Sequence, residues 1–225
     1  MIMRNIFTLL FIVIFSSSLV AQQGKDPEAK AILEKVKNKV ESFSSFKVNY
    51  TFHLKSSVSE MDESYDGEII VQDKKFAMKN GDGTETYNNG KKVWTYYEEE
   101  NEVNVYDYDP EDEMFSFNKI LNVKEEDYKF RMMGEETIEG TVCYVIDLEP
   151  DLTPEERKTN QVYKIRVHID KSTSQLVRWK IFERNGNRYT TTINKFEPNV
   201  PVTKDTFVFD KSKHKGVTVI DMSAD

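Results

Sequence analysis

A strict alternation of apolar and polar residues recurs along most of this chain after residue 45. Residues 46–54, FKVNYTFHL, place Phe, Val, Tyr, Phe and Leu on one face and Lys, Asn, Thr and His on the other. A period of two is typical of a β-strand with one buried face. Similar alternation predicts further strands over 65–71, 76–78, 93–96, 103–108, 130–132, 142–148, 163–169, 176–182, 189–196 and 207–209.

Short links rich in turn residues connect these segments, for example at 88–90, 98–101, 170–175 and 185–187. Links of this kind join neighbouring strands as hairpins. About eleven consecutive antiparallel strands predict one meandering sheet, which must curl or close to avoid a long open edge. We therefore expect a mainly β fold of the α+β class, an open, incomplete antiparallel β-barrel.

Two helices are predicted beside this sheet. Asp26 is a suitable N-cap and Pro27 fits the first helical position, and apolar residues then recur at steps of three and four through residue 43. A second, short helix is predicted near 112–121, where the apolar spacing is closer to that of a helix than to that of a strand. Both helices would cover the sheet as a lid.

The first 21 residues have the pattern of a secretory signal peptide. Arg4 precedes an apolar run over 6–15, and small residues follow at 16–18 and 21. The run is shorter than the roughly 20 apolar residues that a spanning helix needs, although a retained membrane anchor is the alternative. Cleavage would leave residues 22–225 as a single domain, exported to the periplasm.

Charge and cysteine content exclude some functions. The formal net charge is −8, which argues against nucleic acid as a partner. Cys143 is the single cysteine, so no internal disulfide is possible. His53 and His168 fall on the polar sides of their strands, which predicts solvated surface positions. The acidic run at 107–113 lacks the Gly and the final Glu of a calcium-binding loop. We expect no metal, no cofactor and no catalytic residues.

Five segments, taken in chain order, resemble one known family. They are DPEAKAILEKVKNKVESFSSFKVNYTF, YDGEIIVQDKKFAM, YNNGKKVWTYYEEENEVNVY, MFSFNKIL and FVFDKSKHKGVTVID. Together they are similar to the periplasmic lipoprotein carrier LolA and its lipoprotein-sorting relatives. The resemblance implies an open β-barrel that accepts the acyl chains of lipid-modified outer-membrane lipoproteins. It also implies two partners, an inner-membrane ABC release complex and an outer-membrane acceptor or the outer membrane itself.

One departure from the family concerns its latch arginine, which helps to hold the lid closed. In the matching strand this chain has Lys74 and Lys75, which are the candidates for that role. A lysine is a point charge without the guanidinium fork, so the two are not equivalent to an arginine.

The physical requirement for such a carrier is an apolar surface that the chain itself does not fill. An acyl chain of about 16 carbons costs about 12 kcal/mol to expose to water. Each large apolar residue taken singly is more often ordinary core, but a single sheet with two helices has too little cover to fill its inner face. The residues predicted to line an acyl-chain cavity are Phe52, Phe76, Met78, Trp94, Tyr96, Phe115, Ile120, Leu121, Ile146 and Trp179.

Three functions are compatible with these features. The first is a monomeric periplasmic chaperone that carries lipoproteins to the outer membrane. The second is a periplasmic module that senses lipid or peptide on the same half-barrel and signals through protein contacts. The third, an enzyme acting on a lipid or glycan, needs a reactive dyad, and no pair of residues in the sequence suggests one.

Overall fold

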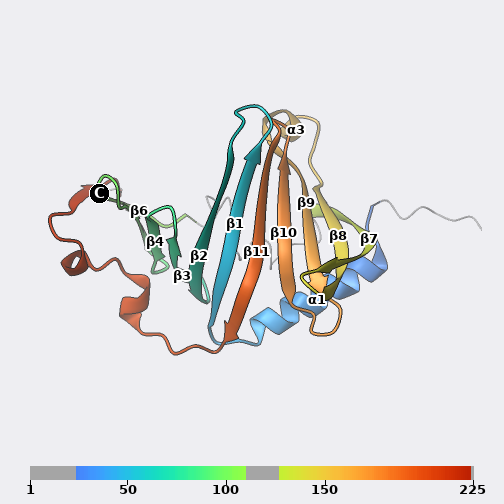
Figure 1. The fold of residues 1–225 in the computed structure, drawn as a ribbon, viewed down its shortest axis with the longest axis horizontal. Helices are drawn as coiled ribbons and strands as arrows, with labels where there is room; N and C mark the ends of the chain where they lie inside the picture. The colour runs from blue at the N-terminus through green and yellow to red at the C-terminus, as the bar shows by residue number, and fades with distance from the viewer. Residues whose placement is uncertain (1–23, 110–126, 224–225) are drawn as a thin grey trace, which may run out of the picture.

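The computed structural model describes residues 24–109 and 127–223, which form one broad, open sheet with a helix across one end (Figure 1). The helices are α1 (Pro27–Glu41) and α3 (Glu156–Thr159), with 3-10 turns η2 (Lys204–Phe207) and η3 (Lys211–Lys213). The strands are β1 (Phe46–Ser56), β2 (Asp62–Gln72), β3 (Lys75–Asn80), β4 (Thr84–Asn88), β5 (Lys92–Tyr97), β6 (Glu102–Asp107), β7 (Tyr128–Ile138), β8 (Thr141–Pro150), β9 (Val162–Asp170), β10 (Leu176–Glu183), β11 (Asn187–Pro198) and β12 (Thr218–Asp221).

The sheet consists of two meanders joined at one central seam. Its strand order is β12-β6-β5-β4-β3-β2-β1-β11-β10-β9-β8-β7, so β1 pairs with β11 and the described edges are β12 and β7. All pairs are antiparallel except β12 with β6, which is parallel. The mainly β, open architecture is therefore confirmed, and the sheet is not closed into a barrel.

Three details of the predicted strand pattern are wrong. The 12-stranded sheet is not one continuous meander, because β1 pairs with β11 as well as with β2. Strand β4 was missed, since its residues TETYN do not alternate between apolar and polar side chains. The segment 207–209 is not a strand: Phe207 ends η2, and the chain forms β12 only at Thr218.

The predicted N-terminal helix is present over Pro27–Glu41. Asp26 Oδ1 accepts hydrogen bonds from the backbone N–H groups of Glu28 and Ala29, at 2.9 and 3.3 Å, as an N-cap does. The other carboxylate oxygen, Oδ2, accepts from Met132 N at 3.2 Å. One side chain thus begins the helix and fixes it to the edge strand β7.

The two faces of the sheet carry separate hydrophobic clusters. We call the face that contacts α1 the helix face, and the other the opposite face. On the helix face, Ala29, Ile32 and Val36 of α1 belong to a large cluster with side chains of β1, β2 and β7–β10. On the opposite face, a smaller cluster contains Tyr96, Val103, Phe209 and Val217, with Tyr87 and Trp94 packed against it. The C-terminal segment covers this second cluster.

Two predictions lie outside the described residues: the signal peptide over 1–21 and the short helix near 112–121. Of the helices that the structure describes, none has the length and apolar character needed to cross a membrane.

Candidate functional site

Five of the predicted cavity residues lie together on the helix face. Ile146 and Trp179 are buried, with 0 and 5% of their surface exposed, whereas Phe52, Phe76 and Met78 are partly buried against the same cluster. Cross-strand pairs explain this grouping, because residues directly paired in a sheet point to the same face. The buried two belong to the core beneath α1, and the partly buried three offer apolar surface beyond it.

Trp94 and Tyr96 do not join this group. Met78 pairs with Thr86, and Thr86 pairs with Thr95, so Thr95 shares the helix face with Met78. Its two neighbours in β5 point the other way, since side chains alternate along a strand. Trp94 and Tyr96 therefore lie on the opposite face, in the cluster under the C-terminal segment, and the expectation of a single cavity containing all of these residues does not hold.

The remaining predicted residues divide into two kinds. Phe115, Ile120 and Leu121 lie outside the described residues. Ile70 and Ala77, which pair with each other, point to the opposite face. Lys75 and its partner Gln72 each lie two positions from that pair along their strands, so Lys75 also points to the opposite face. Lys74 lies in the turn between β2 and β3, where its carbonyl accepts a hydrogen bond from Asn88 Nδ2 at 3.3 Å.

Several helix-face residues were not predicted as site residues. Val48, Ile69 and Val71 belong to the same cluster as Met78 and Phe76. These residues occupy apolar positions in the alternating patterns of β1 and β2. Once Phe52 is assigned to the helix face, the same alternation assigns them to that face as well.

Two tyrosines place hydroxyl groups among the apolar side chains. Tyr50 donates to Asn80 Oδ1 at 2.5 Å, and its ring lies over Gly67, where a Cβ atom would come within 2.4 Å of the ring. Burial, followed by the charge of Asp82, raises the pKa of Tyr65 to about 12. Burial also raises the pKa of Tyr50. Both hydroxyls therefore stay protonated at neutral pH and add no charge to this face.

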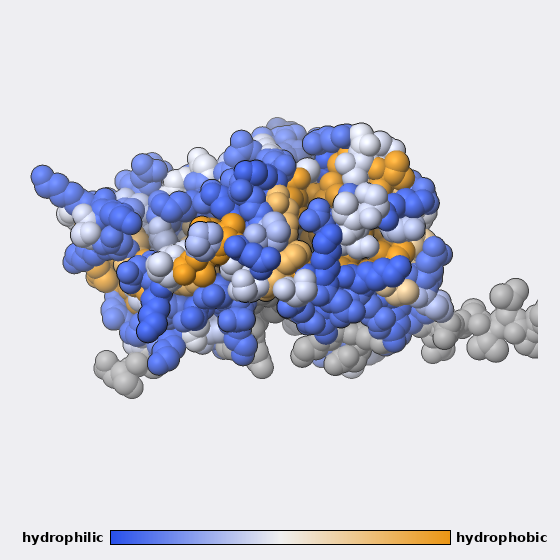
Figure 2. Space-filling model, turned by 90° about the horizontal axis from the view of Figure 1, so that it is seen from below, coloured by the Kyte–Doolittle hydropathy of each residue, from blue (hydrophilic) through white to orange (hydrophobic). Residues whose placement is uncertain are grey.

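Hydrophobic side chains reach the surface in several places. Seen from below the view of Figure 1, toward the end of the sheet that α1 crosses, orange surface appears in recesses bordered by hydrophilic residues (Figure 2). A small pocket of about 20 Å³ separates the C-terminal end of α1 from β10 and β11, with Val36, Val40 and Ile193 among its lining residues. Part of the apolar interior is thus accessible from outside.

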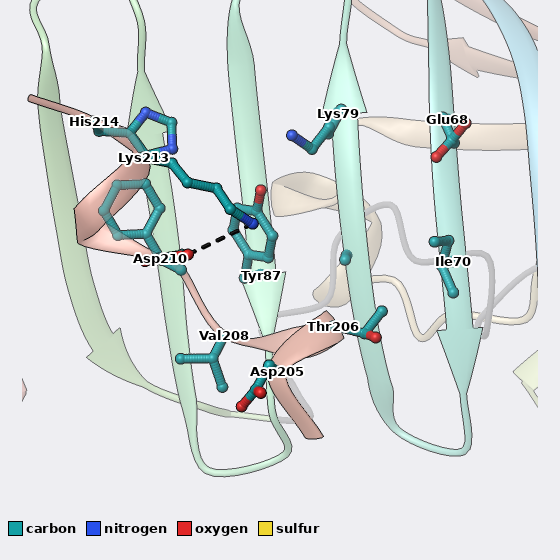
Figure 3. Close-up of a pocket in the computed structure, with 12 residues that line it drawn as sticks. Glu68, Ile70, Lys79, Tyr87, Asp205, Thr206, Val208, Asp210, Lys213 and His214 are labelled. Carbon is teal, nitrogen blue, oxygen red and sulfur yellow. Dashed lines mark ion pairs between the residues drawn. The ribbon is translucent and has the colours of Figure 1, made fainter. Parts of the chain in front are cut away.

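A wider groove lies on the opposite face, between β2–β4 and the C-terminal segment (Figure 3). Its volume is about 610 Å³, and its floor includes Ile70, Ala77 and Tyr87. Its charged side chains are largely paired with one another or with neighbours. The pairs are Asp210 with Lys213 at 3.5 Å, Lys79 with Glu85 at 2.9 Å and Glu68 with Lys47 at 2.6 Å. A groove lined in this way has little charge left to bind an ionic ligand.

His168 is not a solvated surface residue, contrary to the sequence prediction. It does point to the opposite face, but it is fully buried, and its Nε2 lies 3.0 Å from Glu136 Oε2. Burial lowers the pKa of the imidazole, and the hydrogen bond and charge of Glu136 oppose that shift. Within 24–109 and 127–223, no three His, Cys, Asp or Glu side chains come together as a metal site would require.

The fold and its surfaces define a class: an open, single-sheet binding fold with one apolar face partly covered by a helix. The family model of the outer membrane lipoprotein carrier protein LolA matches residues 41–210. This chain belongs to that family, which confirms the resemblance seen in the sequence. No curated protein matches the chain.

Solved structures that are similar to this chain share little sequence with it. An uncharacterized conserved protein from Thermus thermophilus is 12% identical with a TM-score of 0.55, covering 86% of this chain and 99% of its own. The lipoprotein LppX of Mycobacterium tuberculosis is 16% identical with a TM-score of 0.52, covering 80 and 100%. A LolA-superfamily protein from Nitrosomonas europaea is 12% identical with a TM-score of 0.43, covering 81 and 98%. At these identities the first two establish the fold alone.

Proposed function

We propose that this chain is a periplasmic carrier that binds the acyl chains of lipoproteins against the helix face of its sheet. It would receive them from an inner-membrane ABC release complex and deliver them to the outer membrane or to an acceptor there. The observation that carries this proposal is the apolar helix face, which continues from the core beneath α1 to the partly buried Phe52, Phe76 and Met78. Membership of the LolA carrier family supports the same function.

The energetics of the cargo set what the face must provide. Exposing an acyl chain of about 16 carbons to water costs about 12 kcal/mol of free energy, so the chain needs continuous apolar contact during transfer. Aromatic and methionine side chains supply that contact without a fixed shape, since methionine is unbranched and adaptable. Met78 and Met132 both pack at the border of the helix-face cluster.

Loading would require the cover of this face to move. In this proposal the acyl chains displace α1, together with the short helix that the sequence predicts near 112–121, and bind to the helix face of the sheet. Release follows when an acceptor or the outer membrane offers a deeper apolar environment. The monomer is sufficient for this cycle, because the proposed binding face belongs to a single sheet.

Opposite faces of the same part of the sheet provide a matched test. Met78→Glu places a carboxylate on the helix face, and Trp94→Glu places one on the opposite face. We expect Met78→Glu to abolish binding of a dipalmitoylated lipopeptide, with Trp94→Glu retaining it, when urea unfolding shows both variants folded. Equal loss in both variants, or retention in both, would contradict the proposed binding face.

The cargo itself can be identified from the native source. The protein purified from the periplasm should carry acylated polypeptide that mass spectrometry detects, and Met78→Glu should remove it. Purified wild-type protein that carries only a signalling partner and no acylated chain would favour the alternative function of a lipid- or peptide-sensing module.

A further inference from the structure

One line of paired residues crosses six strands of the helix face and changes character along its length. In order, the residues are Val48, Ile69, Met78, Thr86, Thr95 and Asn104, each paired with the next. Neighbouring strands are about 4.8 Å apart, so the polar half of this line begins about 5 Å from Met78. The apolar face proposed for acyl chains thus runs directly into a polar surface on β4–β6.

That polar surface is almost without charge. The side chains at helix-face positions of β4, β5 and β6 are Thr84, Thr86, Asn88, Val93, Thr95, Tyr97, Glu102, Asn104 and Tyr106, of which Asn88 and Val93 are buried. Glu102, at the start of β6, is its one ionisable acid or base apart from the tyrosines. A sheet face that serves only to meet water normally carries Lys and Glu.

The cations of this half of the sheet are sorted by face. Strands β1–β6 contain five lysines and no arginine, and all five lie at opposite-face positions: Lys47, Lys55, Lys75, Lys79 and Lys92. A ligand carboxylate or phosphate on the helix face of these strands would meet no cation from them. Desolvating an anion without a partner is costly, so this surface disfavours anionic head groups.

The same surface offers hydrogen-bond donors. Thr95 Oγ1 lies 2.6 Å from the Tyr106 hydroxyl, and one hydrogen serves that contact. The other hydroxyl hydrogen of the pair is therefore available to an acceptor on a ligand. Tyr106 and Tyr97 are 36 and 37% exposed, so both rings are open to contact. Ester and amide carbonyls are neutral acceptors of the kind that such hydroxyls bind.

We infer that the helix face of β4–β6 binds the neutral ester and amide linkages of an acylated ligand whose hydrocarbon chains lie on β1–β3. This inference rests on the proposed function and specifies its ligand class. The site selects neutral acylglycerol-type groups over free fatty acids and anionic phospholipids.

Probes with equal chains and different head groups test the inference. Monopalmitoylglycerol and palmitate each have one chain, and dipalmitoylglycerol and dipalmitoylphosphatidylglycerol each have two. We expect the neutral member of each pair to bind at least about tenfold more tightly. It gains one or two hydrogen bonds and does not incur the free-energy cost of desolvating an unpaired anion. Equal or reversed preference in the wild-type protein overturns the inference but not the proposed function. Failure of all four probes and of the lipopeptide overturns both.

Variants assign the selectivity to this surface. Thr86→Val with Thr95→Val removes two hydroxyls and keeps the shape, and we expect it to lower the affinity for monopalmitoylglycerol about tenfold without changing that for palmitate. Thr95→Lys should raise the affinity for palmitate. Thr190→Val, on the opposite face of β11, is the control and should change neither. A double variant that weakens binding of both probes equally shows a general disturbance of the binding face instead and overturns the inference.

Discussion

The ring of Tyr50 lies directly over Gly67 of the neighbouring strand, so that a Cβ atom at residue 67 would sit 2.4 Å from the ring. The absence of a side chain at Gly67 is therefore a packing requirement. It allows a buried tyrosine to extend across β2 and donate its hydroxyl hydrogen to Asn80.

Gly67→Ala should accordingly destabilise the protein by about 1–3 kcal/mol, the usual cost of overpacking a buried site. Urea unfolding measures this loss. In a Tyr50→Leu background, the same Gly67→Ala change should cost much less, because the ring is gone. Additive effects of the two substitutions would show that the contact is not the cause.

The two carboxylate oxygens of Asp26 bind different backbone groups, so their contributions to stability can be measured separately. Asp26→Ala removes the N-cap of α1 and should cost about 1–2 kcal/mol. Asp26→Ser keeps a capping oxygen but loses the bond to Met132 N. Hydrogen exchange at the Met132 amide should therefore rise in both variants, whereas exchange in the first turn of α1 should rise strongly only in Asp26→Ala.

Phe209 should hold the C-terminal segment to the opposite face. Its ring packs 5.5 Å from Tyr96 and 4.5 Å from His214, measured between ring centroids. We expect Phe209→Ala to increase hydrogen exchange over 204–221 and to leave β8–β10 protected. Phe46→Ala, in the helix-face cluster, is the matched control and should instead loosen β1 and β11. Uniform loss of protection in Phe209→Ala would contradict an independent second cluster.

His168 gives the stability a defined pH dependence. Burial lowers its pKa below the ordinary 6.5, so the unfolded chain takes up a proton at higher pH than the folded protein does. This contribution to stability is complete above pH 6.5 and is lost as the pH falls from 6.5 to the lowered value. We expect His168→Gln to flatten the fall in unfolding free energy over that range, relative to the wild type. An unchanged slope in His168→Gln would rule out this source.

The sequence predicted the local elements well because their signals are local. The alternation in 46–54 identifies the buried side of β1, and Asp26 with Pro27 marks the start of α1. The alternation within one strand does not show which of its faces lies on the same side of the sheet as a given face of another strand. A shift of one residue in a hairpin reverses every side chain, so Met78 and Trp94 could not be assigned to the same or different faces from their own strands.

Strand pairings and burial that depend on residues far apart in the chain could not be predicted from the local sequence pattern either. Nothing local in residues 218–221 indicates a parallel pairing with β6, and nothing in 46–56 indicates a partner in 187–198. His168 was placed on the correct face, but its burial depends on β7, which supplies Glu136, and on β10, which supplies its paired residue Arg178.

The central seam has a consequence for how the molecule is made. Phe46 pairs with Pro198, which lies far along the chain from it. Each meander can form from hairpins between consecutive strands. Pairing of β1 with β11, in contrast, closes a long loop and carries the entropy cost of that closure. We expect the seam to be the slow, final step of folding. Until it closes, two unpaired inner strands remain exposed to other chains, and a folding assistant would be most needed at that stage.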